Sequence, residues 1–403
     1  MEIDFGPEAA QFRTEIREWI EGNAPDGLAA LTDWNAVGLT GGYDVNNDAR
    51  HSPLFAEWER QMLDAKLICP RWPVEYGGRG FSPVQMAVFA EEMDRARLPW
   101  IRRGFGENMV GPSVMRHGTA EQRDHFLPRI ISGEDVYCQG FSEPDHGSDL
   151  AGVQTKGVVD GDELVLTGRK LWTSGFYRAN MIFVLCRTDT DAPKHRGLSY
   201  VLVPFKNNNI EARPVRQMTG AAQFGEETFD GARAPLFNVI GGLGNGWQVA
   251  MTTLGFERGG GASTAHLRFE RQFWDLVELA RKVGREREPV VRQQLAWAYT
   301  HVQIMRFSGL RLLARLADGQ DPGPESSTSK LFWSEYEKRL GEIAFELLGS
   351  EGLVRPAGEG YPTSPWQDVF LASRAGTIFS GTSEIQRNIL SERVLGLPKG
   401  GRS

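Results

Sequence analysis

The sequence has few cysteines and no long apolar segment. Cys69, Cys138 and Cys186 are far apart and form no C-x-x-C pair, which argues against a disulfide framework and a cysteine-based zinc site. A reducing, cytoplasmic location fits best. The first residues lack the basic, apolar and small-residue succession of a signal peptide, and no stretch approaches the roughly 18 apolar residues that a membrane helix requires. We therefore expect a soluble, unprocessed protein with no membrane span.

An excess of positive charge is also absent. The chain has 45 Lys and Arg against 52 Asp and Glu, a formal net charge of -7, whereas nucleic acid and anionic membranes are bound by cationic surfaces. No nucleic-acid partner is expected. The histidines form no H-E-x-x-H or paired-ligand spacing, so no metal is predicted. The stretch Gly242-Leu-Gly-Asn-Gly246 has the wrong spacing and context for a dinucleotide loop and predicts a turn before a helix.

What remains is an ordinary globular composition, with 403 residues of which 40% are hydrophobic and 24% charged. Helical patterns cover 54–66, 83–95, 111–117 and 120–132, after an amphipathic first helix around Phe12 and Trp19 and a loop-like stretch from 23 to 53. Strand-like runs then occupy 136–141, 163–169, 181–187, 198–204 and 210–215. Helical patterns return at 247–256, 262–283, 289–317, 329–348, 365–379 and 383–395.

This segregation of helices and strands predicts an α+β fold rather than an alternating βαβ chain. We place the domain limits at 1–134 for an N-terminal helical domain, 135–240 for a middle β domain and 241–403 for a C-terminal helical domain. The charge cluster at 281–289 (RKVGREREP) is interpreted as a solvated helix end and loop, with a phosphate or intersubunit contact as the alternative.

Three separated segments have residues suited to a cofactor. The first is Gln139-Gly-Phe-Ser-Glu-Pro-Asp-His-Gly-Ser-Asp-Leu150. A turn built on Pro144 and Gly147 leaves backbone N–H groups free to donate to a ring edge or a diphosphate. The same residues also suit a plain hairpin turn with a satisfied serine and aspartate.

The second segment is Gly168-Arg-Lys-Leu-Trp-Thr-Ser-Gly175. A flat cofactor ring needs an aromatic wall and a few donors, which Trp172, Thr173 and Ser174 can supply. A tryptophan at a strand end is otherwise a core residue.

The third segment is Phe379-Ser-Gly-Thr-Ser-Glu-Ile-Gln-Arg-Asn388. Gly381 permits close backbone approach, and Thr382 is a natural helix N-cap whose neighbouring N–H groups can face an anion or a cofactor oxygen. Taken alone, this segment is only a capped helix.

Together the three segments resemble the acyl-CoA dehydrogenase family, whose signatures are (T/S)-E-P-x-A-G-S-D, G-x-K-x-W-I-T/S-N-G and Y-E-G-T-S-E-I-Q-R. The order of helices, strands and helices is similar over essentially the whole chain. The resemblance implies FAD as cofactor, a β-barrel-like middle domain and a C-terminal four-helix bundle. It implies FAD contacts by Gln139, Phe141, Ser142, Gly147, Ser148, Trp172, Thr173, Ser174, Thr382, Ser383 and Glu384.

One departure from the family concerns the catalytic base. Many members carry it as the Glu just before Gly-Thr, where this chain has Ser380, and a serine without a neighbouring base cannot remove an α-proton near neutral pH. A minority of the family uses the first residue of a Glu-Arg pair on the helix after the β domain, which here is Glu257. We therefore expect Glu257 as catalytic base, although a solvated charge pair is the alternative. The resemblance implies Ser148, Phe256, Arg258 and Gly381 as substrate contacts.

The implied reaction is removal of two hydrogens from an acyl-CoA thioester, giving the 2,3-enoyl-CoA, with electrons passing to an electron-transfer flavoprotein. Gly259 to Gly261 could make room for a wide acyl group or simply kink the helix. Two rivals stay open: a flavin oxidase or monooxygenase of the same fold, and a catalytically silent or FAD-contributing subunit. His146 stands where the family usually has Ala, and its role is open.

Two further departures concern the oligomer. The family's R-x-x-F-G stretch corresponds to RKVGREREPVVRQQL, without Phe-Gly, and its Q-I-L-G-G corresponds to Glu346-Leu-Leu-Gly-Ser350. The resemblance implies a homo-oligomer, a dimer or tetramer, and these changes make a hetero-oligomer an alternative.

Overall fold

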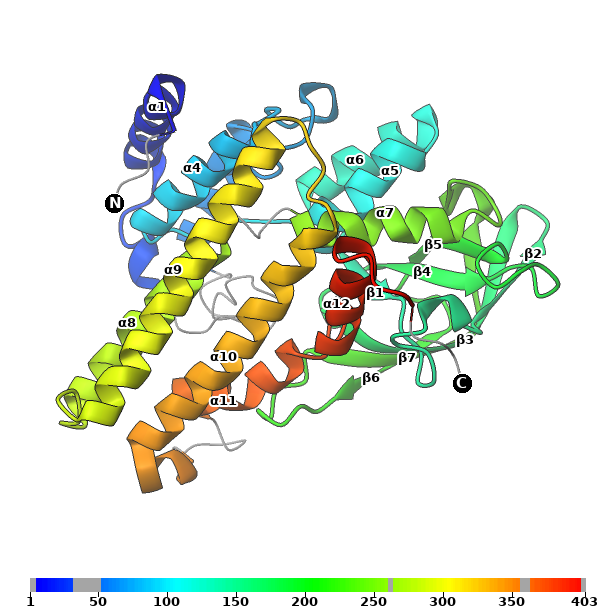
Figure 1. The fold of residues 1–403 in the computed structure, drawn as a ribbon. Coiled ribbons are helices and arrows are strands. Elements are labelled where there is room, and N and C mark those ends of the chain that lie inside the picture. Colours follow the sequence, from blue (N-terminus) through cyan, green and yellow to red (C-terminus); the bar gives the residue numbers. More distant parts are fainter. Residues whose placement is uncertain (1–4, 32–51, 260–263, 356–362, 400–403) are drawn as a thin grey trace.

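Helices at both ends of the chain flank a central sheet, as the sequence predicts. The computed structural model describes residues 5–31, 52–259, 264–355 and 363–399. Figure 1 shows the sheet on the right, the long helices α8 to α11 on the left and the N-terminal helices across the top. The N-terminal elements are α1 (Pro7–Asn23), η1 (Leu28–Leu31), α3 (Pro53–Asp64), η2 (Val74–Tyr76), α4 (Pro83–Arg95), η3 (Gly106–Val110), α5 (Gly111–His117) and α6 (Ala120–Ser132).

Side chains that cap helix ends fix several of these boundaries. Ser82 opens α4 and Thr119 opens α6, each in a capping box with a glutamine three residues later. Such a box satisfies backbone donors that the first helical turn leaves free. Gly133 closes α6 in the left-handed conformation, which glycine adopts without steric cost. The predicted limits of α4, α5 and α6 are confirmed.

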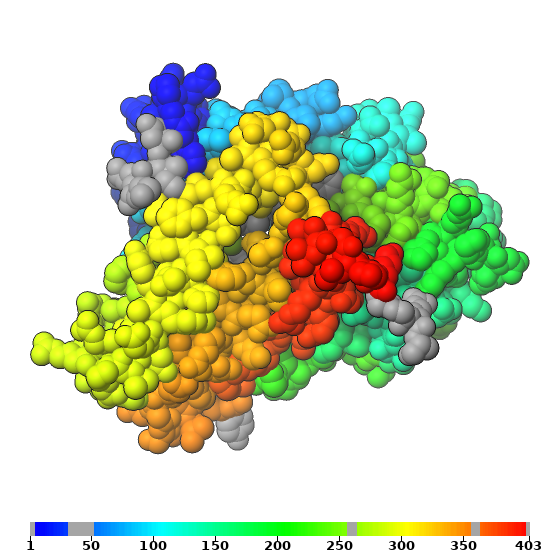
Figure 2. All heavy atoms as spheres, viewed as in Figure 1, coloured from blue at the N-terminus to red at the C-terminus, as the bar shows by residue number. Residues whose placement is uncertain are grey.

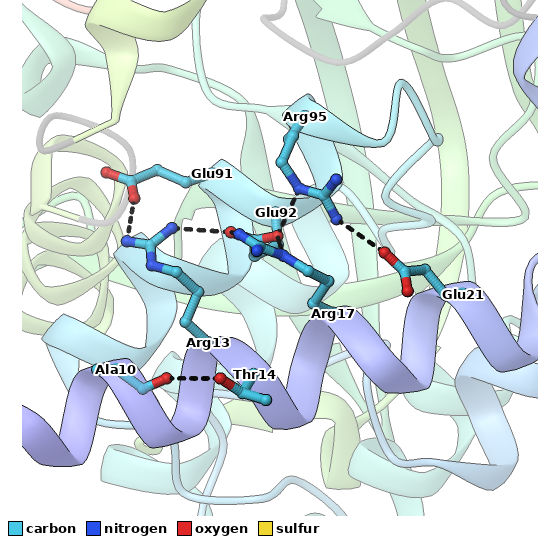
Figure 3. A network of polar contacts seen from close by, with 8 residues as sticks. All are labelled: Ala10, Arg13, Thr14, Arg17, Glu21, Glu91, Glu92 and Arg95. Atoms are coloured by element: carbon cyan, nitrogen blue, oxygen red, sulfur yellow. Dashed lines mark hydrogen bonds and ion pairs between the residues drawn. The ribbon is translucent and has the colours of Figure 1, made fainter.

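A buried carboxylate joins the first helix to the fourth. Glu92 of α4 accepts hydrogen bonds from Arg13 and Arg17 of α1 and from Arg95 of its own helix, at 2.7 to 3.0 Å (Figure 3). Charge-assisted bonds of this kind are stronger than neutral ones. The network therefore fixes α1 on α4 beside the apolar contacts of Phe12 and Ile16.

The middle of the chain forms one sheet of eight strands in the order β6-β7-β3-β2-β4-β5-β8, with β1 paired to β4. The strands are β1 (Tyr137–Gly140), β2 (Lys156–Asp160), β3 (Glu163–Ser174), β4 (Met181–Arg187), β5 (Leu198–Pro204), β6 (Ile210–Val215), β7 (Phe224–Pro235) and β8 (Val239–Ile240), with η4 (Leu150–Gly152) and η5 (Leu236–Asn238) between them. Strands β2, β7 and β8 were not predicted. In β7, inward positions carry Gly225 and Glu227 rather than large apolar residues, so the alternating pattern is weak.

The C-terminal part is again helical. It comprises α7 (Gly246–Gly259), α8 (Ala265–Lys282), α9 (Pro289–Ala317), η6 (Pro324–Ser326), α10 (Ser327–Leu348), η7 (Gly349–Leu353), α11 (Pro365–Gly376), α12 (Ser383–Ile389) and η8 (Leu390–Val394). Figure 2 shows the same face in spheres, with the C-terminal segment in red lying on the α10 and α11 region. Among the described residues, no helix is long and apolar enough to cross a membrane.

Three apolar cores hold the fold together. The first spans the N-terminal helices, one face of the sheet and α7, through residues such as Phe183, Tyr200 and Val249. The second lies within the sheet and includes Cys138 and Phe229. The third joins α8, α9 and α10. Because α7 shares the first core, it is packed with the sheet and the N-terminal helices rather than with the bundle.

Candidate functional site

The first predicted segment follows β1 as a tight turn. The backbones of Glu143 and His146 exchange two hydrogen bonds, of 3.0 and 3.1 Å. Gln139 is half-buried in β1, Phe141 is buried against Phe183 and Tyr200, and Ser142 is half-buried. Gly147 and Ser148 are exposed at the turn. The segment thus presents polar groups on a rigid base of aromatic side chains.

A buried ion pair joins this turn to the second segment. The Lys170 ammonium donates to Glu143 Oε1 at 2.9 Å and to the carbonyls of Phe141 and Leu185 at 3.0 and 2.8 Å. Glu143 also accepts from the backbone N–H groups of Gln154 and Thr155. Burial alone would raise the pKa of Glu143, but the Lys170 charge and these donors hold that pKa below its ordinary value. Both charges are therefore matched inside the protein.

Trp172 in the second segment is the extra residue of a β-bulge. Leu171 pairs with Glu226 and Thr173 with Gly225, so Trp172 has no partner on β7. Its φ of 65° lies in the left-handed region, which is strained for an aromatic residue. Its side chain is 55% exposed. Bulges re-aim side chains near active sites, and this one turns an indole out of the sheet.

The residues that follow Trp172 point to different sides. The Thr173 side chain is buried and its hydroxyl donates to Glu227 Oε2, so that hydroxyl faces the interior. Ser174 is half-buried. The Leu171 N–H donates to the Ser142 carbonyl at 2.9 Å. The first two segments therefore form one unit, with Ser142, Trp172 and Ser174 at its accessible side.

The third segment is built on the bundle. Thr382 caps α12 by accepting from the Ile385 N–H at 3.2 Å. Ser383 is buried and donates to Glu335 of α10 at 2.7 Å, whereas Glu384 in the first turn is exposed. Gly381 and Ser380 both have positive φ, and Ser380 is exposed. The turn before α12 is thus held by α10.

The expected base lies in the last turn of α7. The side chains of Phe256, Glu257 and Arg258, and residues 260–263 with Gly260 and Gly261, lie outside the described part of the chain. The preceding turn is fixed to α5. Thr253 and Ser113 share a buried hydrogen bond of 2.7 Å, and His117 Nε2 lies 2.8 Å from the Thr252 hydroxyl. These contacts set the position of the helix that carries Glu257.

The two oligomer-related departures lie next to each other. Arg285, in the charge cluster, donates to the Glu346 carbonyl at 2.7 Å. The Glu346 carboxylate accepts from Gln294 and from Arg339. The anion that replaces the family's glutamine is therefore neutralised within the chain.

Three buried ionisable residues were not predicted as part of the site. Glu143 and Lys170 lie inside the first and second motif segments. An acid in one motif and a base in the other could have indicated that the two residues form a buried ion pair. Glu227 lies on β7, a strand that the pattern did not indicate. No group of three or more His, Cys, Asp or Glu side chains able to hold a metal ion occurs among the described residues.

The described residues fit an FAD ring. An isoalloxazine needs an apolar face and nearby donors, and the exposed indole of Trp172 with the half-buried hydroxyls of Ser142 and Ser174 offers both. A strained backbone such as that of Trp172 persists where the surrounding structure enforces it, and such strain is common at binding sites. Trp172, Ser142 and Ser174 would hold the ring, with Thr382 and Glu384 as further contacts.

Comparison with known proteins extends the resemblance to the whole chain. Models of the N-terminal, middle and C-terminal domains of acyl-CoA dehydrogenase match residues 43–134, 138–231 and 244–395. Acyl-CoA dehydrogenase IpdE1 of Mycolicibacterium smegmatis is 40% identical over 405 residues, covering 97% of this chain and 98% of the relative.

Solved structures agree with this. The chain resembles the Tcur3481-Tcur3483 steroid ACAD, at 29% identity and a TM-score of 0.80 over 99% of this chain and 100% of that one. The ChsE4-ChsE5 complex from Mycobacterium tuberculosis gives 26% identity and a TM-score of 0.78, with coverage of 99% and 100%. With the helical, sheet and helical parts in the family's order and all three domain models matched, this chain belongs to the acyl-CoA dehydrogenase family of FAD flavoproteins and is an oxidoreductase acting on acyl-CoA.

Proposed function

We propose that the chain catalyses FAD-dependent α,β-dehydrogenation of an acyl-CoA thioester to the 2,3-enoyl-CoA, with Glu257 as the base. The observation that carries the proposal is the residue before Gly381, which is Ser380 and not an acid. An α-proton needs a base of suitable pKa within reach, and a serine hydroxyl is not such a base near neutral pH. Because the chain belongs to the family and has Ser380 at this position, we assign the role of base to Glu257, the first residue of the Glu-Arg pair on α7.

In this mechanism the Glu257 carboxylate takes the α-proton of the acyl group. FAD, when bound, supplies the two-electron acceptor for the β-hydrogen. A backbone N–H near Glu257 would donate to the thioester oxygen, because the negative charge that develops there must be stabilised. The contacts of Thr252 and Thr253 with α5 would keep the base from drifting, and small misplacements of a catalytic group are costly.

We further propose a bulky acyl group as substrate and an electron-transfer flavoprotein as electron acceptor. The similarity to a protein titled a steroid ACAD supports a ring-bearing acyl group, and the run Gly259-Gly-Gly261 supports a site with few side chains in the way.

A second candidate is an FAD-contributing or catalytically silent subunit of a hetero-oligomer. The contact of Arg285 with the Glu346 carbonyl favours it, because this contact joins, within the chain, the two segments at which the sequence departs from the family's oligomer-related motifs. Two of the similar structures are named as pairs of different chains. In that case turnover would require co-expression with a second chain.

The test is an anaerobic visible-absorption titration of the FAD-loaded protein with straight-chain, branched and ring-bearing acyl-CoA thioesters. Bleaching of the flavin band by a ring-bearing thioester is the expected result. Glu257→Gln should slow the bleaching by about a hundredfold to ten-thousandfold and leave FAD bound. The matched control is Glu278→Gln, an exposed helical acid paired with Arg281, which should bleach at the unmodified rate.

Four other outcomes would contradict parts of the proposal. Unchanged bleaching in Glu257→Gln would remove Glu257 as the base. Preference for short straight chains would exclude the bulky substrate. A bound flavin that no thioester reduces would favour the subunit role, and rapid reoxidation by air with turnover would favour an oxidase.

A further inference from the structure

Glu227 is a carboxyl buried inside the sheet directly behind the bulge at Trp172. It lies on β7, and its relative exposure is 0%. Its Oε1 atom and the ring of Phe176 both lie where a side chain at Gly225 would stand, so the absence of a Cβ at Gly225 makes the space that this carboxyl occupies. Phe176 packs on the sheet core that contains Cys138. The carboxyl therefore sits in an apolar interior.

Only one side of this carboxyl is hydrogen-bonded. Oε2 accepts from the Thr173 hydroxyl, whereas Oε1 is buried and has no hydrogen-bond partner among the described residues. A carboxylate can accept about four hydrogen bonds, and an ionised one left without donors in an apolar interior is costly. A neutral carboxyl needs fewer partners and fits this environment better.

The charged groups that the structure describes around Glu227 offer it no cation. Lys170 is its register partner on β3, but the ammonium is bound to Glu143 and to two carbonyls. The register partner of Glu227 on β6 is Ala212, which carries no charge. Its neighbour on β1 is the Cys138 thiol, and the adjacent residue Glu226 carries a charge of the same sign. The pKa of Glu227 is raised to about 8, because burial and the Glu226 charge, which both raise it, outweigh the Thr173 hydrogen bond, which lowers it.

We propose that Glu227 is a positioning residue for the FAD site: its carboxyl accepts the Thr173 hydroxyl bond, and in the neutral form it does so without placing a charge behind the bulge at Trp172, which thereby stays in the arrangement that receives the flavin. The left-handed backbone of Trp172 is strained and persists only where the surroundings enforce it. Thr173 is the next residue, and its inward hydroxyl bond is one such restraint. Loss of the proton places a charge in the apolar interior, which water or a rearrangement of β3 must then accommodate.

This inference rests on the FAD assignment and not on Glu257, so its test uses binding and spectra rather than turnover. The FAD dissociation constant and the absorption and fluorescence of bound FAD are measured as a function of pH, with free FAD as baseline. In the unmodified protein we expect a one-proton transition with a midpoint near the pKa of about 8. Above the midpoint FAD affinity should fall by up to about tenfold per pH unit.

Three variants isolate the group responsible. Glu227→Gln, which mimics the neutral carboxyl, should remove the transition and keep the low-pH spectrum throughout. Thr173→Val removes the hydroxyl through which Glu227 holds the bulge, so the dependence of FAD affinity on pH should be weaker than in the unmodified protein. Glu226→Gln is the matched control: its carboxylate pairs with Arg169 at the surface, so the transition should persist, with a midpoint somewhat lower because the Glu226 charge raises the pKa of Glu227.

Two results would overturn the proposal. The first is a transition in Glu227→Gln with the same midpoint as in the unmodified protein, and the second is the absence of any transition in the unmodified protein. If Glu227→Gln does not fold, infrared spectroscopy of the unmodified protein decides. A protonated-carboxyl band should disappear with the same midpoint as the flavin transition, and its absence at neutral pH excludes the proposal.

Discussion

Glu92 and Glu227 are two buried carboxyl groups in different regions, and their acidities diverge. Glu92, between α1 and α4, is 1% exposed and accepts from three arginines (Figure 3). Burial raises its pKa, but the bonds to Arg17, Arg13 and Arg95 outweigh this and bring the pKa to about 2. Glu227, in the sheet, has the Thr173 hydroxyl as its one hydrogen-bond donor among the described residues, and burial raises its pKa to about 8.

The difference teaches that the available donors, and not the depth of burial, decide whether a carboxyl is charged. Glu143, in the turn after β1, shows that burial beside the sheet does not by itself make a carboxyl neutral. Lys170 and two backbone N–H groups keep that buried acid ionised. The ammonium of Lys170 serves Glu143 and not Glu227, although Lys170 and Glu227 are register partners. Strand β3 therefore contacts one ionised acid, Glu143 of the turn after β1, and one neutral acid, Glu227 of β7, that can titrate.

The largest effect should come from breaking the matched pair in the sheet. Lys170→Met leaves the Glu143 carboxylate buried without its cation, which should lower the free energy of unfolding by about 3–5 kcal/mol. Urea unfolding measures this. Lys156→Met, on the exposed start of β2, is the control and should change it by less than about 0.5 kcal/mol. Equal losses in the two variants would show that the ion pair does not anchor the motifs.

The next effect should come from removing the carboxylate that the arginines surround. Glu92→Gln loses charge-assisted bonds, and we expect a loss of about 2–3 kcal/mol at neutral pH. Because the folded pKa is about 2 against an ordinary 4.5, this stability is present above pH 4.5 and is lost as the pH falls toward 2. Glu91→Gln, which removes a single bond to Arg13, should cost less than about 1 kcal/mol. A Glu92→Gln loss no greater than that would contradict the prediction.

Glu227 should give the opposite pH dependence. Its folded pKa of about 8 lies above the ordinary 4.5, so the unfolded chain loses this proton first and stability falls as pH rises between these values. The contribution is at most about 1.4 kcal/mol per pH unit. The difference between the unmodified protein and Glu227→Gln, measured by urea unfolding at several pH values, should show this slope. A difference independent of pH would mean that Glu227 does not titrate there.

The smallest effect should be at the surface of the same two strands. Arg169 pairs with Glu226, and both side chains retain solvent contact. Arg169→Gln should therefore change stability by less than about 1 kcal/mol, measured by thermal unfolding alone and in combination with Glu226→Gln. A coupling above about 2 kcal/mol would mean that an exposed pair contributes like a buried one.

The sequence carried most of the architecture. Apolar periodicity predicted α4, α5, α6, β4, β5 and α9 with their observed limits, because each has a full stripe or run of apolar residues and clear end signals. Strand β7 was missed because Gly225 and Glu227 occupy inward positions. It is a strand because it pairs with β3 along its length, and pairing of distant segments leaves little local trace.

The candidate site divides in the same way. The three motif segments, FAD and the family could be predicted, because turn, cap and aromatic residues recur in short stretches. The way in which these segments come together in the folded protein could not be predicted. The bulge against β7 decides that Thr173 turns inward while Trp172 turns outward. The hydrogen bond from Ser383 to Glu335 forms only because α10 packs beside α12.

The sequence by itself determined the helices, most strands, the family and the absence of an acid at Ser380, since each is a property of neighbouring residues along the chain. Only the tertiary structure decided that Lys170 binds Glu143 and that, in the described part of the chain, Glu227 is left with one donor. The physical reason is that the charge state of a buried acid depends on the donors and on the loss of water around it, and both come from segments that are brought together only on folding.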